Sequence, residues 1–199
     1  MRRQFVRLAL VASVALAGAA PSLAGNLIAT DGVANWQGAY VGIHGGAGLG
    51  TAGTLSTGGT LYGAHGGINM QSNQLIAGIE ADYDQSDIKN LSSTESFKQS
   101  WMATGRGRGG IAFGNNLAYG TLGVAMTDTN YTNVNSTNLL KFGAVYGGGL
   151  ETMAMPNVVL RGEFLHYEFG PGSYLDSLGA TKSLDTKSNV FRFGIAYKF

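Results

Sequence analysis

The C-terminal stretch Asn189–Phe199 reads NVFRFGIAYKF, and this stretch decides the fold. Every second side chain in it is large and apolar, namely Phe191, Phe193, Ile195, Tyr197 and Phe199. The residues between them are small or charged. Strict alternation places the two sets on opposite faces of a β-strand. A soluble edge strand this apolar would aggregate, whereas a strand between lipid and a crowded lumen requires this pattern.

The N-terminus predicts export. Three arginines precede an apolar run at residues 8–20, and the small residues Ser22 and Ala24 fit a signal-peptidase site after Ala24. The apolar run is too short for a retained transmembrane helix, which is the alternative. We therefore expect a signal peptide at 1–24, a short N-terminal periplasmic segment at 25–35, and one barrel domain at 36–199.

Composition excludes several classes of function. The chain has 13 basic and 12 acidic residues, and removing the signal takes away three arginines, which leaves ten against twelve and a net charge of −2. A nucleic-acid-binding surface is therefore not expected. The absence of cysteine excludes disulfides and thiolate metal sites. Many glycines (32) with few prolines (3) favour a tightly curved sheet over disorder.

Seven further segments alternate in the same way as the C-terminal strand. They lie at about 37–49, 61–71, 75–84, 100–113, 117–127, 140–152 and 158–169. The links between strands are alternately short (71–74, 114–116, 153–157) and long (50–60, 85–99, 128–138, 170–188). This pattern predicts an all-β fold, an eight-stranded antiparallel transmembrane β-barrel with short periplasmic turns and longer outer loops.

Two details of this barrel follow from the strand pattern. Poor alternation in the upper half of segment 158–169 indicates a possible bulge. An even number of strands places both termini on the periplasmic side, and we expect no further domain after the eighth strand.

If the apolar parity faces lipid, the strand charges face the lumen. The expected lumen charge network comprises Glu80, Asp82, Arg106, Arg108, Glu151, Arg161, Glu163 and Arg192. Asp84 and Lys198 share this parity, which makes five acids and five bases. Counting from the periplasmic strand ends places Glu80 opposite Arg108 and Asp82 opposite Arg106, with some offset from barrel shear. Such a network is either a structural polar core or a charged constriction for ions.

Three other features suggest chemistry only weakly. Residues 105–110 (GRGRGG) fit the spacing GxGxxG, but the strand pattern continues through them and no helix follows. His44 and His65 are expected to point inward on adjacent strands, where they are either lumen groups or ligands of haem or a metal. Lipid A deacylases carry a serine two residues after the catalytic histidine, and this chain lacks that pattern. We predict no catalytic residues, no cofactor and no metal.

Large aromatic residues lie near the expected strand ends. These residues are Trp36, Tyr40, Tyr83, Trp101, Tyr119 and Tyr197. Because aromatic rings favour the membrane–water interface, we predict that they form interfacial belts.

Short motifs follow one another in a distinctive order: NWQGAYVG at 35–42, GIEADY at 78–83, RGRGGIA at 106–112, GGGLE at 147–151, RGE at 161–163 and FRFGIAYKF at 191–199. In this the chain resembles the small porin-like outer-membrane immunogenic proteins of alphaproteobacteria, within the opacity-type barrel superfamily. It departs from their pattern at Ala39, where an aromatic residue is common, and at Thr152, where tyrosine often follows the glutamate.

The resemblance implies an abundant surface antigen in the Gram-negative outer membrane, with roles in envelope integrity and sometimes in adhesion or haemin binding. The terminal strand looks like the assembly signal of outer-membrane barrels, which implies the barrel-assembly machinery and periplasmic chaperones as partners, beside outer-membrane lipid and lipopolysaccharide. We expect a structural, surface-exposed barrel. The alternatives are a narrow pore for ions or small solutes and a receptor for haemin or a host ligand; an enzyme is not expected.

Overall fold

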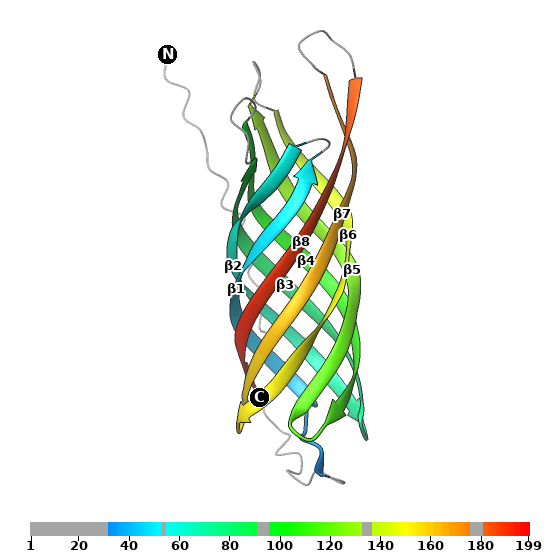
Figure 1. The fold of residues 1–199 in the computed structure, drawn as a ribbon. Helices are drawn as coiled ribbons and strands as arrows, with labels where there is room; N and C mark the ends of the chain where they lie inside the picture. The colour runs from blue at the N-terminus through cyan, green and yellow to red at the C-terminus, as the bar shows by residue number, and fades with distance from the viewer. Residues whose placement is uncertain (1–31, 53–54, 91–95, 133–136, 176–180) are drawn as a thin grey trace, which may run out of the picture.

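Eight antiparallel strands close into a barrel in the computed structural model, which describes residues 32–52, 55–90, 96–132, 137–175 and 181–199 (Figure 1). The strands are β1 (Gly38–Ala52), β2 (Leu55–Ser72), β3 (Leu75–Asn90), β4 (Ser96–Phe113), β5 (Asn116–Thr132), β6 (Thr137–Met155), β7 (Val158–Leu175) and β8 (Thr181–Lys198). Each strand pairs with the next along the chain, and β8 pairs with β1. The predicted fold class is confirmed. The expected signal peptide lies outside the described residues.

The two faces of each strand differ as the alternation predicts. On β8 the side chains of Phe191, Phe193 and Tyr197 are 52%, 65% and 50% exposed, whereas Arg192 between them is fully buried. The same contrast recurs on β3, where Ile79 is exposed and Glu80 is buried. One parity therefore forms an apolar outer wall, and the other parity fills the barrel.

The strands are longer than predicted. They span 15 to 19 residues each, so parts of the segments expected to be long loops, such as 57–60 and 85–90, are paired strand. Above the apolar band the outward residues are polar, as at Ser56 and Gln85. The contrast between faces that marks a strand in the sequence is lost there, although the backbone pairing continues.

The three short turns lie at one end of the barrel, together with the C-terminus (Figure 1). Asn73 and Asn157 occupy two of these turns with positive φ angles of 54° and 68°. Asparagine tolerates this left-handed conformation better than most residues, which explains how such tight links close.

Irregularities interrupt the ladders toward the opposite end. The register between β7 and β8 shifts between Phe169 and Gly172, in the half of β7 where the alternation fails. A shift also occurs between Gln85 and Ile88 where β3 pairs with β4. Such bulges bend a strand and increase its twist.

The barrel interior consists of three layers. Nearest the short turns is an apolar cluster, called the lower cluster: Val33, Trp36, Tyr40, Ile76, Ala112, Leu117, Tyr119, Val159 and Ala196. A second apolar cluster, called the upper cluster, lies toward the other end: Leu61, Met102, Ala125, Val145, Leu165, Tyr167, Phe169 and Val190. The charged side chains lie between the two.

The segment that precedes β1 closes the end with the short turns. The side chains of Val33 and Trp36 are buried in the lower cluster. The backbone of Ala34 donates to the carbonyl of Gly114 at 2.8 Å, and the backbone of Trp36 donates to the side-chain oxygen of Gln71 at 2.6 Å. This segment therefore packs against two of the turns as part of the core. Among the described residues, no helix is long and apolar enough to span a membrane.

Candidate functional site

The middle layer of the lumen brings together all eight charged residues expected there. Each of Glu80, Asp82, Arg106, Arg108, Glu151, Arg161, Glu163 and Arg192 is buried and takes part in at least two ion pairs. The residues come from β3, β4, β6, β7 and β8, so the network crosses the barrel rather than following one ladder.

Glu80 is the centre of the half of this network that lies nearer the short turns, called the lower half. Its carboxylate pairs with Arg106, with Arg161 at 2.5 Å and with Arg108 at 3.4 Å. Glu151 pairs with two of these arginines, with Arg108 at 2.9 Å and with Arg161 at 2.7 Å. Each of these two carboxylates thus pairs with both guanidinium groups, and Arg106 joins Glu80 to the upper half.

Arg192 is the centre of the upper half. It pairs with Glu163 at 2.7 Å, Asp82 at 3.2 Å and Asp84 at 3.3 Å. Arg106 completes this half through Asp82 at 2.8 Å and Glu163 at 3.1 Å. Charge-assisted hydrogen bonds of this kind are shorter and stronger than neutral ones, so the layer ties five strands together.

The rungs of the expected ladder are offset by two residues. Arg106, not Arg108, lies directly opposite Glu80, and Asp82 faces Thr104. The prediction measured both strands from their ends, but β4 extends two residues beyond β3 at the short-turn end, because Leu75 pairs with Ile111. The stagger that closes a barrel accounts for this offset. Both expected ion pairs still form, as diagonals.

Two tyrosines belong to this network and were missed. Tyr40 donates to Glu80 at 2.7 Å, and Tyr119 donates to Glu163 at 2.7 Å. The guanidinium carbon of Arg108 lies 4.1 Å from the ring centroid of Tyr119, within the range of a cation–π contact. The signal was present in the sequence, because Tyr40 shares the parity of the inward residue His44.

The predicted aromatic belt is therefore wrong for three of its six members. Trp36, Tyr40 and Tyr119 are buried inside the barrel, at 1%, 7% and 7% exposure. Tyr83 and Tyr197 lie on the outer wall, at 45% and 50% exposure. Position near a strand end suggested a belt, but within the strands parity decides which face a ring occupies, and Trp36 precedes β1.

Lys198 does not join the network. It lies half-buried at the rim, where its Nζ donates to the carbonyl of Phe199 at 3.4 Å. No described carboxylate forms an ion pair with it. The expected balance of five acids and five bases is therefore wrong. Five carboxylates, including Asp84, meet four guanidinium groups.

His44 and His65 both point into the lumen, with 6% and 3% exposure. Their rings stack at 5.2 Å between centroids, and their Nδ1 atoms are 3.0 Å apart. His44 Nε2 also lies 2.5 Å from Asp84 Oδ1. A Cβ atom at Gly42 would come within 2.7 Å of the His65 ring, so this place has no room for a haem. Within the described part of the chain, no group of three His, Asp or Glu residues is arranged to hold a metal ion.

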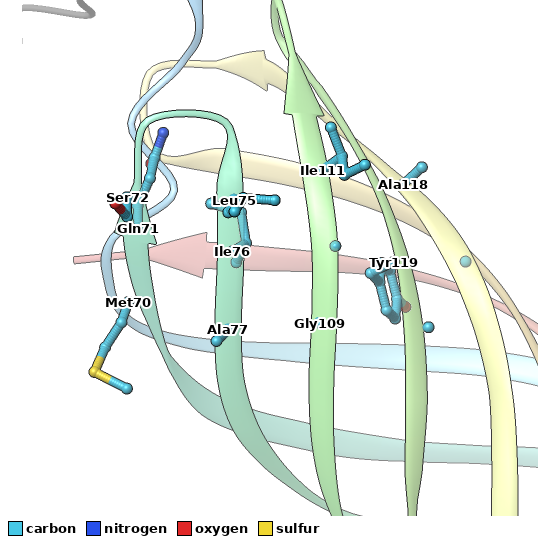
Figure 2. A pocket seen from close by; sticks show the side chains of 13 residues that line it. Met70, Gln71, Ser72, Leu75, Ile76, Ala77, Gly109, Ile111, Ala118 and Tyr119 are labelled. Carbon is cyan, nitrogen blue, oxygen red and sulfur yellow. The ribbon is translucent and has the colours of Figure 1, made fainter.

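The outer wall carries a shallow apolar hollow beside the β2–β3 turn (Figure 2). Its lining includes Met70, Leu75 and Ile111, together with Gly109 and Gly120. Ideal Cβ atoms at these two glycines would meet nothing closer than 3.8 Å, so the hollow results from missing side chains rather than from tight packing. It belongs to the lipid-facing wall and lacks any charged side chain directed outward.

Comparison with known proteins agrees with the barrel fold described above. The model of the family described as outer membrane protein beta-barrel domain matches residues 8–199. The chain belongs to this family. It is similar to the 25 kDa outer-membrane immunogenic protein of Brucella melitensis, with 32% identity over 83% of this chain and 80% of that protein. It is also similar to the 22 kDa outer membrane protein of Rhizobium leguminosarum bv. viciae, with 30% identity over 83% and 79%. The expected family and the outer-membrane location are confirmed.

Solved structures show the same fold at low sequence identity. Neisserial surface protein A superposes with a TM-score of 0.60 at 14% identity, covering 81% of this chain and 97% of that one. Ail, the attachment invasion locus protein of Yersinia pestis, superposes with a TM-score of 0.53 at 17% identity, covering 82% and 99%. These likenesses concern the barrel architecture alone.

Proposed function

We propose that this outer-membrane protein is a structural barrel with a closed lumen, which contributes to envelope integrity and presents a surface for contact outside the cell. The observation that carries the proposal is the charged layer across the lumen. Side chains in its ion pairs are at most 3% exposed, and they reach one another from five strands. A network this dense supports a stiff wall-to-wall connection rather than a passage.

Barrel size and the layers on either side support the same function. The interior of an eight-stranded barrel is only wide enough for side chains to fill. Here apolar clusters lie above and below the charges, and Trp36 is buried in the lower one. An ion would have to displace side chains in all three layers. A narrow pore is the alternative that conductance would support.

The outer surface supports a role in lipid contact and at the cell exterior. Exposed apolar side chains such as Ile43, Val124 and Phe193 give the wall its affinity for the membrane. Lipid and lipopolysaccharide are the partners that we propose for this wall. The polar residues Ser56 and Gln85 lie beyond the apolar band, on the side away from the short turns. We propose that this end provides the surface contact.

Single-channel recording in planar bilayers tests the proposal. Folded wild-type protein is expected to give no steady conductance. Arg108→Glu places a third carboxylate beside Glu80 and Glu151, so a protein with an open lumen would change its preference between cations and anions. Regular wild-type channels whose ion preference changes in this variant would support the pore instead. Heat-dependent mobility on a denaturing gel verifies that both proteins are folded.

We also propose that the terminal strand is the assembly signal, carried by Phe191, Phe193, Ile195, Tyr197 and Phe199. In support, β8 closes the barrel against β1, and the backbone of Phe199 donates to the carbonyl of Ala39 at 2.9 Å. Deleting Phe199 is expected to lower the amount of folded protein in the outer membrane at least several-fold.

The matched control is Phe113→Ala, which changes an exposed phenylalanine at the same end of the barrel on β4. Since Phe113 is outside the terminal strand, its loss is expected to leave surface levels close to those of the wild type. Equal surface levels for the Phe199 deletion and the wild type would refute the assignment.

A further inference from the structure

The charges of the lumen do not balance. The buried middle layer contains five carboxylates and four guanidinium groups among the described residues. Lys198 is at the rim and Lys141 is at the far end, on the other side of the upper apolar cluster, where its Nζ donates to Thr186 at 3.5 Å. With both histidines neutral, the layer would hold one negative charge without a matching cation. A buried charge that lacks a partner is costly, so a cation is missing from this count.

The deficit lies at Asp84. Each of the other four carboxylates pairs with at least two arginines. Asp84 pairs with Arg192 alone, at 3.3 Å, and Arg192 is shared with Asp82 and Glu163. Asp84 is nevertheless fully buried. Any additional positive charge is therefore needed next to this carboxylate.

His44 is in the position to supply that charge. Its Nε2 is 2.5 Å from Asp84 Oδ1, and its Nδ1 is 3.0 Å from His65 Nδ1. If both ring nitrogens of His44 carry protons, one donates to the carboxylate and the other to the unprotonated Nδ1 of His65. Both short contacts are then satisfied by a single imidazolium, and His65 remains neutral.

The charged and titratable groups around this pair come from several neighbouring strands. His65 faces it from β2, Asp84 and Asp82 from β3, and Arg192 from β8, with its Nη1 3.2 Å from His44 Nε2. Arg192 opposes a charge on His44, and a protonated Nε2 cannot accept a hydrogen bond from it. The same Nη1 has carboxylate acceptors on Asp82 and Asp84, each at 3.3 Å. Glu80 of β3 and Arg161 of β7 interact electrostatically with His65, and Tyr167 of β7 interacts with Asp84 and Arg192. The tyrosine ring of Tyr40 lies 6.2 Å from His65 and carries no charge.

We propose that Asp84, His44 and His65 form a buried proton-binding site, in which His44 is the fifth cation of the lumen. The proton completes the charge balance of the layer that closes the barrel.

Nitrogen NMR of the histidine rings tests the site directly. The chain has three histidines, and His166→Gln removes the one outside the lumen. In this variant, folded in micelles at about pH 8, one ring is expected with both nitrogens protonated and one with a single proton. In the double variant that adds Asp84→Asn, the doubly protonated ring is expected to disappear. Two neutral rings in the folded single variant would overturn the proposal.

Urea unfolding tests the charge balance. His44→Gln removes the proposed cation and leaves Asp84 with Arg192 as its only cationic partner, so this variant is expected to unfold at lower urea than the wild type. Adding Asp84→Asn removes the unbalanced carboxylate, so the double variant is expected to regain most of the loss. Glu168→Gln, which removes a half-exposed carboxylate on the outer wall, is the matched control and is expected to restore nothing when it is combined with His44→Gln. A double variant no more stable than His44→Gln alone would contradict the proposed balance, and the ring measurement stands even if a variant fails to fold.

Discussion

The inner and outer faces of β3 place opposite demands on residues that are adjacent in sequence. Ile79 is 67% exposed on the outer wall, and Glu80 is 5% exposed in the lumen, where it contacts three arginines and Tyr40. The wall needs apolar character and little else, because lipid tails accept any apolar side chain. The lumen needs particular partners in particular places. Substitutions inside should therefore be costly even when they are conservative, and substitutions outside should matter only when they add charge.

The largest effect is expected for Arg192→Met. This change leaves the fully buried carboxylates of Asp82, Asp84 and Glu163 with fewer cations, and breaking a buried ion pair in this way costs about 3–5 kcal/mol. Urea titration of the barrel in lipid or detergent measures the loss. Lys187→Met is the matched control, because the Lys187–Glu168 pair is on the outer wall with side chains 58% and 43% exposed. An exposed pair contributes about 1 kcal/mol at most. Equal losses would remove the distinction between the two faces.

A charge on the wall comes next. Ile79→Lys puts an ammonium group at the centre of the apolar band of β3, where a lysine costs about 2–4 kcal/mol. Gln85→Lys, on the same face of the same strand but beyond the band, is expected to cost about 0–1 kcal/mol. Stability in lipid vesicles separates the two. If Ile79→Lys were tolerated as well as Gln85→Lys, the proposed lipid-facing parity would be wrong at this strand.

A single hydroxyl should give the smallest difference. Tyr119→Phe removes the donor to Glu163 but keeps the ring beside Arg108, and a hydrogen bond to a charged group contributes about 1.5–3 kcal/mol. Tyr62→Phe removes a hydroxyl from the outer wall, where the side chain is 68% exposed, and is expected to change stability by less than about 0.5 kcal/mol. The two variants are compared by the same urea titration. A neutral Tyr119→Phe would show that the tyrosine does not belong to the network.

The alternation of apolar and polar residues predicts most of the fold, because lipid and lumen require opposite chemistry of adjacent residues. Phe191 and Arg192 are enough to orient β8, and the parity of Glu80 does the same for β3. The strand count and the short turns follow from where the alternation stops and starts again. Beyond the lipid this contrast fades, which explains why the sequence predicts loops over the outer ends of the strands.

The partners in the lumen could not be predicted in the same way. Parity places Glu80 and Arg106 inside, but the stagger between β3 and β4 decides that they face each other, and that stagger belongs to the closed barrel as a whole. The fate of Lys198 depends on depth, since one step at the rim separates a lumen cation from a half-buried one. Trp36 precedes the first strand, where parity does not apply.

A cysteine placed in the lumen tests the closed interior most directly, because the chain has no cysteine of its own. Thr121 is 8% exposed and lies opposite Arg108, so Thr121→Cys reports on the charged layer. Ser56→Cys, on the outer face beyond the apolar band, reports on open solvent. If the lumen is closed, a water-soluble maleimide is expected to label the cysteine at 56 in the folded barrel, and the cysteine at 121 only after unfolding. Comparable labelling of both in the folded protein would contradict it, because water and solutes would then reach the middle of the lumen.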